Sequence, residues 1–329
     1  PALAGSFAAG NGGVIDLSAL FAVLIVTILL WRGTNTTARV ENVLVIGKVL
    51  VILIFIGVGL TAIHPANYVP FIPAHKPGTD FGGWQGIFAG AAQIFLAYIG
   101  FDSIAANSAE AKDPKKTMPR GIIGSLVIAT ILFVTVALVL VGMFHYSKYA
   151  NNAAPAAWAL LNSGHEFTSN LLSVVALVGM FTAIIGMMLA GSRLLYAFGR
   201  DGLLPKFLGK VNDKGLPNNA LLVLSVIAIL IGSVFSFTEL AGLISAGTLI
   251  AFIIVSLGGY ALRPREGKDI PVPGFKMPLY PVLPALAALG SGFIFYQLDN
   301  QAKLYAFGWF VLGLIIYAAY GARHSKISR

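Results

Sequence analysis

Residues 38–60 read ARVENVLVIGKVLVILIFIGVGL, and after Glu41 this stretch contains a single charged side chain, Lys48. An α-helix needs about 20 apolar residues to cross the ~30 Å hydrocarbon layer of a bilayer. The rest of the chain has a similar character, because 57% of its 329 residues are hydrophobic and only 11% are charged. Soluble domains carry about 25% charged residues. The sequence therefore predicts an all-α polytopic membrane protein that uses the lipid bilayer as its solvent.

Apolar runs of this kind recur along the chain and give nine candidate membrane spans. Connectors rich in proline and charge, such as residues 112–121 and 263–278, separate them and are typical of aqueous loops. The candidate spans are 15–31, 40–62, 82–106, 121–144, 167–199, 219–237, 240–262, 279–298 and 304–322.

The cations are unequally divided between the two sides that alternating spans would create. Only Lys76, Lys148 and Lys303 fall on one side and Lys48 lies within a span, which leaves 18 of the 22 Lys and Arg residues on the other side. Cytoplasmic loops carry such an excess of cations, so the crowded side is predicted to be the inner one. The same asymmetry accounts for the net charge of +9 without a nucleic-acid partner.

Signatures of enzymes and of cofactor sites are absent from the sequence. There is no cysteine, and the five histidines are scattered along the chain. No HExxH pair, G-x-S-x-G elbow or phosphate-cradling loop occurs. We therefore predict no enzymatic activity, no cofactor and no metal site, and we expect any driving energy to come from a gradient.

Lys48 is the first candidate for chemistry, because it lies deep within its span. It is the ninth residue of the span that starts at residue 40, and these eight steps correspond to about 12 Å at 1.5 Å per residue. An ammonium group at this depth must find oxygen acceptors or lose its proton, which suits a proton carrier. The alternative is a side chain that snorkels to the inner surface beside Glu41 or Arg39.

Residues 82–106, GGWQGIFAGAAQIFLAYIGFDSIAA, are the second candidate, because Gly100 lies near their middle and Asp102 and Ser103 follow it. Glycine leaves helical geometry at little cost, and Asp or Ser can cap a helix that restarts. The pattern predicts a broken helix, which transporters use to expose backbone groups to ions and zwitterions. A continuous helix whose Asp faces a neighbouring helix is the alternative.

Thr182 is the third candidate, since its hydroxyl could serve a buried cation. A threonine in a membrane helix more often bonds its own i−4 carbonyl, and that alternative is favoured on sequence alone. Gly179, Gly186, Ala190 and Gly191 give the same span a face of small residues that suits close helix packing.

Three stretches carry a family resemblance: residues 12–53, residues 97–126 and residues 191–205 (GSRLLYAFGRDGLLP). They resemble the cationic amino acid transporter branch of the amino acid, polyamine and organocation superfamily, and the likeness extends over essentially the whole chain. The loop motifs E-x-K-D-P-x-x-x-x-P-R-G-I and R-D-G-L-L-P are the specific part of it.

The resemblance implies a fold. Proteins of that superfamily have twelve helices, of which the first ten form two inverted five-helix repeats. The nine spans would be family helices four to twelve in one transmembrane domain over residues 1–329. Residues 15–62 would end the first repeat, 82–262 would form the second, and 279–322 would be two additional helices. We expect three upstream helices to be missing, which makes this a truncated five-plus-five inverted-repeat fold.

The resemblance also implies roles for particular residues. Lys48 matches a helix-five lysine that takes the place of a sodium ion in proton-driven members, and Thr182 matches a helix-eight position that lines the same site. Main-chain carbonyls at the break in helix six receive the substrate's amino group in relatives, and Leu96 stands where a gating aromatic residue often occurs. The residues assigned to substrate binding at this break are Leu96, Ala97, Tyr98, Ile99, Gly100 and Asp102.

The implied function is secondary active transport of an amino acid across the cell membrane, with protons as the coupling ion. Two alternatives stay open. One is an amino acid exchanger without a proton step, and the other is a fragment or interaction protein that does not transport.

Overall fold

Helices form nearly all of the secondary structure. A computed structural model of the chain describes residues 17–33, 37–79, 81–101, 103–106, 111, 113–150, 152, 154–235 and 237–325. Within these residues β-structure is limited to one isolated bridge between Glu266 and Ile270. The prediction of an all-α polytopic membrane protein is confirmed. The α-helices are α1 (Leu17–Arg32), α2 (Thr37–Thr61), α3 (Gly83–Ile94), α4 (Ser103–Ala106), α5 (Pro114–Met143), α6 (Pro155–Asn162), α7 (Glu166–Arg200), α8 (Asn218–Val234), α9 (Phe237–Leu262), α10 (Val282–Gln297), α11 (Asn300–Ile316) and α12 (Ala322–His324).

Eight of the nine predicted spans coincide with apolar helices. Within the described residues, five helical segments are long and apolar enough to cross a membrane: Val43–Thr61, Pro114–Met143, Glu166–Arg200, Glu239–Arg265 and Asn300–His324. Three shorter apolar helices match the other predictions: Ala19–Arg32, Asn218–Val234 and Val282–Gln297. The ninth span, 82–106, is not a continuous helix, because the chain leaves α-helical geometry after Ile94 and resumes it at Ser103.

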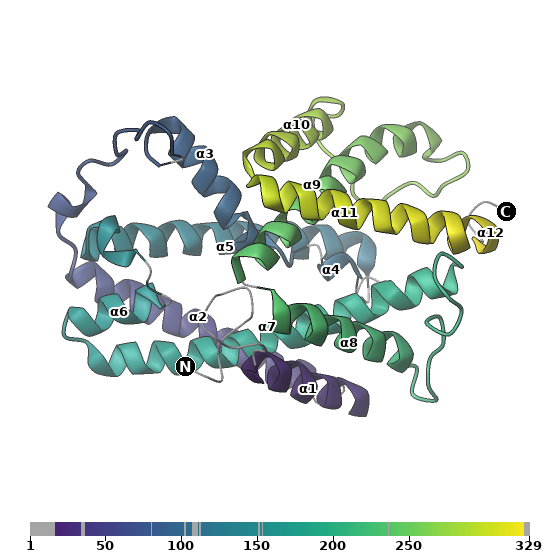
Figure 1. Cartoon of the computed structure of the whole chain (residues 1–329), viewed down its shortest axis with the longest axis horizontal. Coiled ribbons are helices and arrows are strands. Elements are labelled where there is room, and N and C mark those ends of the chain that lie inside the picture. Colours follow the sequence, from purple (N-terminus) through teal and green to yellow (C-terminus); the bar gives the residue numbers. More distant parts are fainter. Residues whose placement is uncertain are drawn as a thin grey trace.

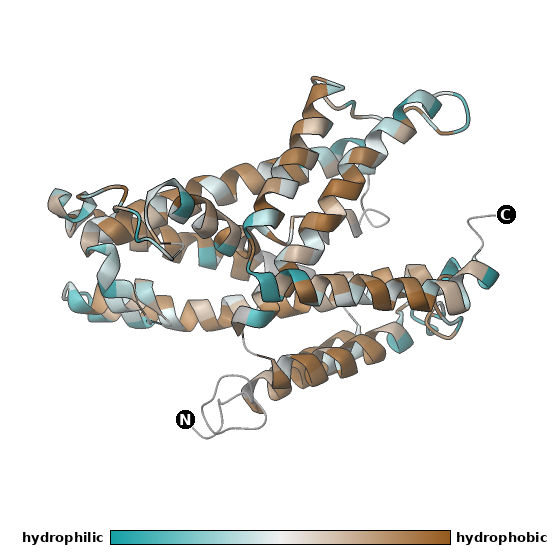
Figure 2. Ribbon diagram, turned by 45° about the horizontal axis from the view of Figure 1, so that its top comes forward, coloured by the Kyte–Doolittle hydropathy of each residue, from teal (hydrophilic) through white to brown (hydrophobic). Residues whose placement is uncertain are grey.

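The helices lie alongside one another as an elongated bundle (Figure 1). The longest helix, α7, has 35 residues and packs against α1, α2, α6 and α8. A second group consists of α9 with its neighbours α10 and α11, and α3 contacts this group. Hydrophobic residues follow most of the helices, whereas hydrophilic residues are most frequent in the loops and at helix ends (Figure 2).

Buried residues form small clusters where helices cross, and many large apolar side chains point outward instead. Ile131 on α5, Leu230 on α8 and Val255 on α9 are 60%, 62% and 72% exposed. Such extensive apolar exposure is foreign to a soluble monomer and suits contact with lipid tails. The three clusters are Phe55, Val139, Met143, Ala159 and Leu160; Ala92, Ala246, Leu249, Leu298 and Ala306; and Val26, Leu30, Met188 and Leu221.

Tyr149 ties the loop that follows α5 to the end of that helix. Its hydroxyl donates a hydrogen bond of 2.6 Å to the carbonyl of Leu140, and its ring packs edge-on against Trp158 with the centroids 5.6 Å apart. Burial raises the pKa of Tyr149 to about 12. The phenol is therefore held neutral in the folded protein at a pH where a solvated tyrosine ionises.

This raised pKa predicts a loss of stability at alkaline pH. Above pH 10 the unfolded chain releases the phenolic proton and the folded chain keeps it, so stability present below pH 10 is lost as the pH approaches 12. Tyr149→Phe removes that dependence and costs about 1 kcal/mol at neutral pH for the lost hydrogen bond. The measurement is the thermal unfolding midpoint, followed by tryptophan fluorescence from pH 7 to 11. Midpoints that fall equally steeply in both proteins would contradict this assignment.

Candidate functional site

Lys48 and Thr182 meet between α2 and α7. The Lys48 Nζ donates a hydrogen bond of 2.6 Å to the Thr182 Oγ1, and Thr182 is only 6% exposed. The same hydroxyl donates to the Gly179 carbonyl at 2.9 Å. Thr182 therefore bonds the i−3 carbonyl, not the i−4 carbonyl favoured on sequence alone, and it accepts from the lysine as well. The side chains of Arg39 and Glu41, the partners in the snorkelling alternative, lie outside the described residues.

Lys48 has one hydrogen-bond partner in the described part of the chain. An ammonium group carries three N–H donors, and among the described residues Thr182 is its one hydrogen-bond acceptor. No described carboxylate forms an ion pair with Lys48. The described residues thus offer this cation a single neutral oxygen in an apolar helix interface, an arrangement that compensates its charge poorly.

Gly179 makes room for the lysine side chain. A Cβ atom at this position would lie 3.1 Å from the Lys48 Cδ, closer than ordinary van der Waals contact. Gly186, two turns further along α7, faces open space instead. Sequence reasoning treated both glycines as one packing face and missed this difference. The i−3 spacing between Gly179 and Thr182 was the available signal, because it places the two residues on the same face of a helix.

The chain breaks its helix between α3 and α4. A 3₁₀ turn, Phe95–Tyr98, follows α3, and Ile99 is extended with φ −67° and ψ 134°. Gly100 has φ +129°, a conformation that side-chain-bearing L residues rarely adopt. The prediction of a broken helix at Gly100 is confirmed. Asp102, predicted to cap the second half, lies outside the described residues.

Four of the six predicted substrate-binding residues line one cavity of about 230 Å³ beside the break. They are Ala97, Tyr98, Ile99 and Gly100. Leu96 is not part of this lining. The first half of α5 contributes Ser125, Leu126 and Ala129 to the same lining. These three residues were not anticipated from the sequence, where nothing distinguishes them from other residues of an apolar span.

Helix α7 contacts both parts of the site: Lys48, through Thr182, and the helix break at Gly100. A Cβ at Gly100 would lie 3.4 Å from the Cε of Met187, and Met187 follows Thr182 by about 7.5 Å along the helix axis at 1.5 Å per residue. The two predicted parts of the site are thus neighbours along α7.

Enlarging Gly179 should displace the lysine from the threonine. Gly179→Val pushes methyl groups into the Lys48 stem, and we expect overpacking to cost about 1–3 kcal/mol. The collision disappears when the stem is removed, so the loss of thermal stability should be smaller in a Lys48→Ala background. Gly186→Val is the matched control and should cost the same with or without Lys48. Equal costs for Gly179→Val in the two backgrounds would refute the proposed contact.

The break predicts a different response at Gly100. Gly100→Ala forces a Cβ atom into positive φ and should destabilise the protein by about 1 kcal/mol or more. Gly90→Ala within α3, where a Cβ meets no atom within 4 Å, should be neutral or stabilising. Thermal unfolding midpoints of the two variants give the comparison. Equal stability would show that Gly100 can adopt helical geometry at no cost.

Comparison with known proteins gives one consistent family. The amino acid permease family matches residues 5–320. The branched-chain amino acid permease BcaP of Lactococcus lactis subsp. cremoris (strain MG1363) is 59% identical over 316 residues, which are 96% of this chain and 68% of that protein.

Two further relatives have other names. The methylthioribose transporter of Bacillus subtilis (strain 168) is 33% identical over the whole of this chain and 69% of its own length. The chloroplastic cationic amino acid transporter 9 of Arabidopsis thaliana is 32% identical over 78% of this chain and 44% of its own length. The chain therefore belongs to the amino acid permease family, within the amino acid, polyamine and organocation superfamily.

Proposed function

We propose that the protein is a secondary active amino acid transporter of the cell membrane, and that it is a symporter in which Lys48 binds and releases the coupling proton. Its membership of the amino acid permease family supports the transporter class. The hydrogen bond of 2.6 Å between Lys48 and Thr182 is the observation that carries the proton role.

This hydrogen bond suits both protonation states of the lysine. The Thr182 hydroxyl donates its single hydrogen to the Gly179 carbonyl, so its oxygen can only accept a hydrogen bond from Lys48. An ammonium and a neutral amine can each donate one N–H to that oxygen. Loss of the proton removes a poorly compensated charge and keeps the hydrogen bond, so the lysine can alternate between the two forms without rearranging its partner.

The cavity beside the helix break favours a small neutral amino acid. Its described lining is mostly apolar, with the hydroxyls of Tyr98 and Ser125 and no charged side chain. Among these described lining residues a cationic or acidic substrate would find no counter-charge. The similarity to a branched-chain amino acid permease points the same way, so we propose an aliphatic amino acid as substrate. Backbone groups freed by the break would bind its ammonium group.

Substitution of Lys48 tests the proton role. Lys48→Ala should abolish accumulation of labelled leucine or isoleucine in proteoliposomes under an imposed pH gradient. Lys48→Arg should also fail, because a guanidinium does not deprotonate in proteins and would keep the site permanently charged. Correct insertion of each variant is the control. Accumulation by Lys48→Arg at the wild-type level would refute the proton role and favour a merely snorkelling lysine.

A second set of measurements tests the role of Thr182 in proton coupling and separates symport from exchange. Thr182→Ser keeps the hydroxyl and should keep the coupling, whereas Thr182→Val removes it and should reduce accumulation at least tenfold. Uptake that requires substrate on the opposite side and ignores the pH gradient would favour an exchanger. If the wild-type protein neither takes up nor binds an aliphatic amino acid, the transporter proposal fails.

A further inference from the structure

A basic cleft opens at the start of α5, on the side predicted to face the cell interior. It has a volume of about 470 Å³ and joins the first turns of α5 to the loop between α9 and α10. Its lining residues combine cations with apolar side chains: Lys115, Lys116, Pro119, Arg120, Ile123, Gly124, Gly274 and Phe275. We call this feature the basic cleft.

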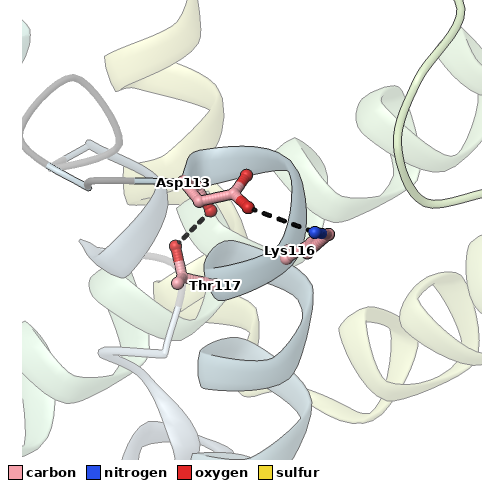
Figure 3. A network of polar contacts seen from close by, with 3 residues as sticks. All are labelled: Asp113, Lys116 and Thr117. Carbon is pink, nitrogen blue, oxygen red and sulfur yellow. Dashed lines mark hydrogen bonds and ion pairs between the residues drawn. The ribbon is translucent and has the colours of Figure 1, made fainter.

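The positive charge of the basic cleft is largely uncompensated. Lys116 forms an exposed ion pair with Asp113 at 3.7 Å, and the backbone carbonyl of Asp113 also accepts a hydrogen bond from Thr117 (Figure 3). Within the described residues no carboxylate pairs with Lys115 or Arg120. The cleft therefore keeps two cations available for an anionic ligand.

The arginines of the neighbouring loop differ in this respect. Arg265 pairs with Asp269, and Arg263 pairs with Glu266 at 3.7 Å and lies over the ring of Tyr280. Both arginines of this loop are thus paired with carboxylates, whereas Lys115 and Arg120 at the start of α5 have no such partner among the described residues.

Close packing fixes the shape of the basic cleft. A Cβ atom at Gly274 would lie 2.6 Å from the Cβ of Lys115, so the loop backbone rests directly on the first turn of α5. A residue larger than glycine would force the two walls apart. The packing of Gly274 against Lys115 therefore fixes the position of Lys115 relative to the neighbouring Phe275.

An exposed apolar stripe leads away from the basic cleft along α5. Its members recur every three or four residues on one face of the helix and are about half exposed. From the first to the last they span about 22 Å at 1.5 Å per residue, which exceeds half of the ~30 Å hydrocarbon layer. The stripe consists of Ile123, Val127, Ile131, Val134 and Leu138, with exposed fractions of 51%, 51%, 60%, 51% and 46%.

We propose that the basic cleft binds an anionic phospholipid of the inner leaflet. The headgroup phosphate lies between Lys115 and Arg120, and an acyl chain follows the stripe that begins at Ile123. Charge complementarity selects an anionic headgroup over a zwitterionic one, since each cation near a membrane surface contributes about a threefold to tenfold gain in affinity for anionic lipid. The apolar stripe selects a lipid over free phosphate, which has no group to place there.

Native mass spectrometry of the purified protein, titrated with phosphatidylglycerol or phosphatidylcholine in neutral detergent, tests this proposal. We expect the first phosphatidylglycerol to bind more tightly than the first phosphatidylcholine. The double substitution Lys115→Gln with Arg120→Gln should weaken that binding at least tenfold. The control pair Lys210→Gln with Lys214→Gln removes the same charge from an exposed loop on the same side and should leave it unchanged. Circular dichroism checks that each variant is folded.

Three results would overturn the proposal. Equal weakening by the control pair would mean that the protein responds to net charge and has no local site. Equal binding of the two lipids by the wild-type protein would remove the anionic selectivity. Displacement of bound phosphatidylglycerol by millimolar inorganic phosphate would identify the cleft as a phosphate site without a role for the stripe.

Discussion

Backbone amide and carbonyl groups in an apolar medium have no water to bind, so nearly all of them must pair within their own segment. This constraint explains why the described chain is helical along its apolar runs. It also explains the location of the departure at residues 95–101, which lies against α5, α7 and α9 and lines a cavity. Irregular backbone is tolerated where it packs on protein or lines a cavity, and polar groups that a helix would use internally become available there to a ligand.

Composition was sufficient to predict the fold class, because 57% hydrophobic residues leave a chain of this length no soluble arrangement. The approximate positions of eight apolar helices followed from the lengths of the apolar runs, whereas the short helices α4, α6 and α12 did not. The division of residues 82–106 followed from a local property, since Gly100 adopts a φ that other residues avoid. Which helices pack together did not follow, because apolar residues of similar size offer several equivalent pairings. The resemblance implied the contact of α2 with α7 at Lys48 and Thr182, whereas the contacts of α7 with α1, α6 and α8 required the structure.

The candidate site could be predicted in part, where a local feature of the sequence marked a residue. A lysine within an apolar run stands out, and its depth alone suggested Lys48. Its partner Thr182 was a candidate from the sequence, but its role beside Lys48 was implied only by the family resemblance, since a single hydroxyl in a membrane helix has an ordinary alternative in its own backbone. The steric role of Gly179 and the α5 wall of the cavity stayed hidden, because they depend on distances between segments far apart in sequence.

The length of α7 has an electrical consequence. Thr182 lies about 24 Å from the Glu166 end and about 27 Å from the Arg200 end of the helix at 1.5 Å per residue. The hydrogen bond between Lys48 and Thr182 therefore lies near the middle of a helix that is longer than the bilayer is thick. If Lys48 carries the coupling proton as proposed, a proton that reaches it from outside has crossed about half of the transmembrane field. Since a full crossing is worth about 2.3 kcal/mol per 100 mV, proton binding at this depth would gain about 1 kcal/mol per 100 mV. The membrane voltage, and not the pH difference alone, would then set the occupancy of the lysine.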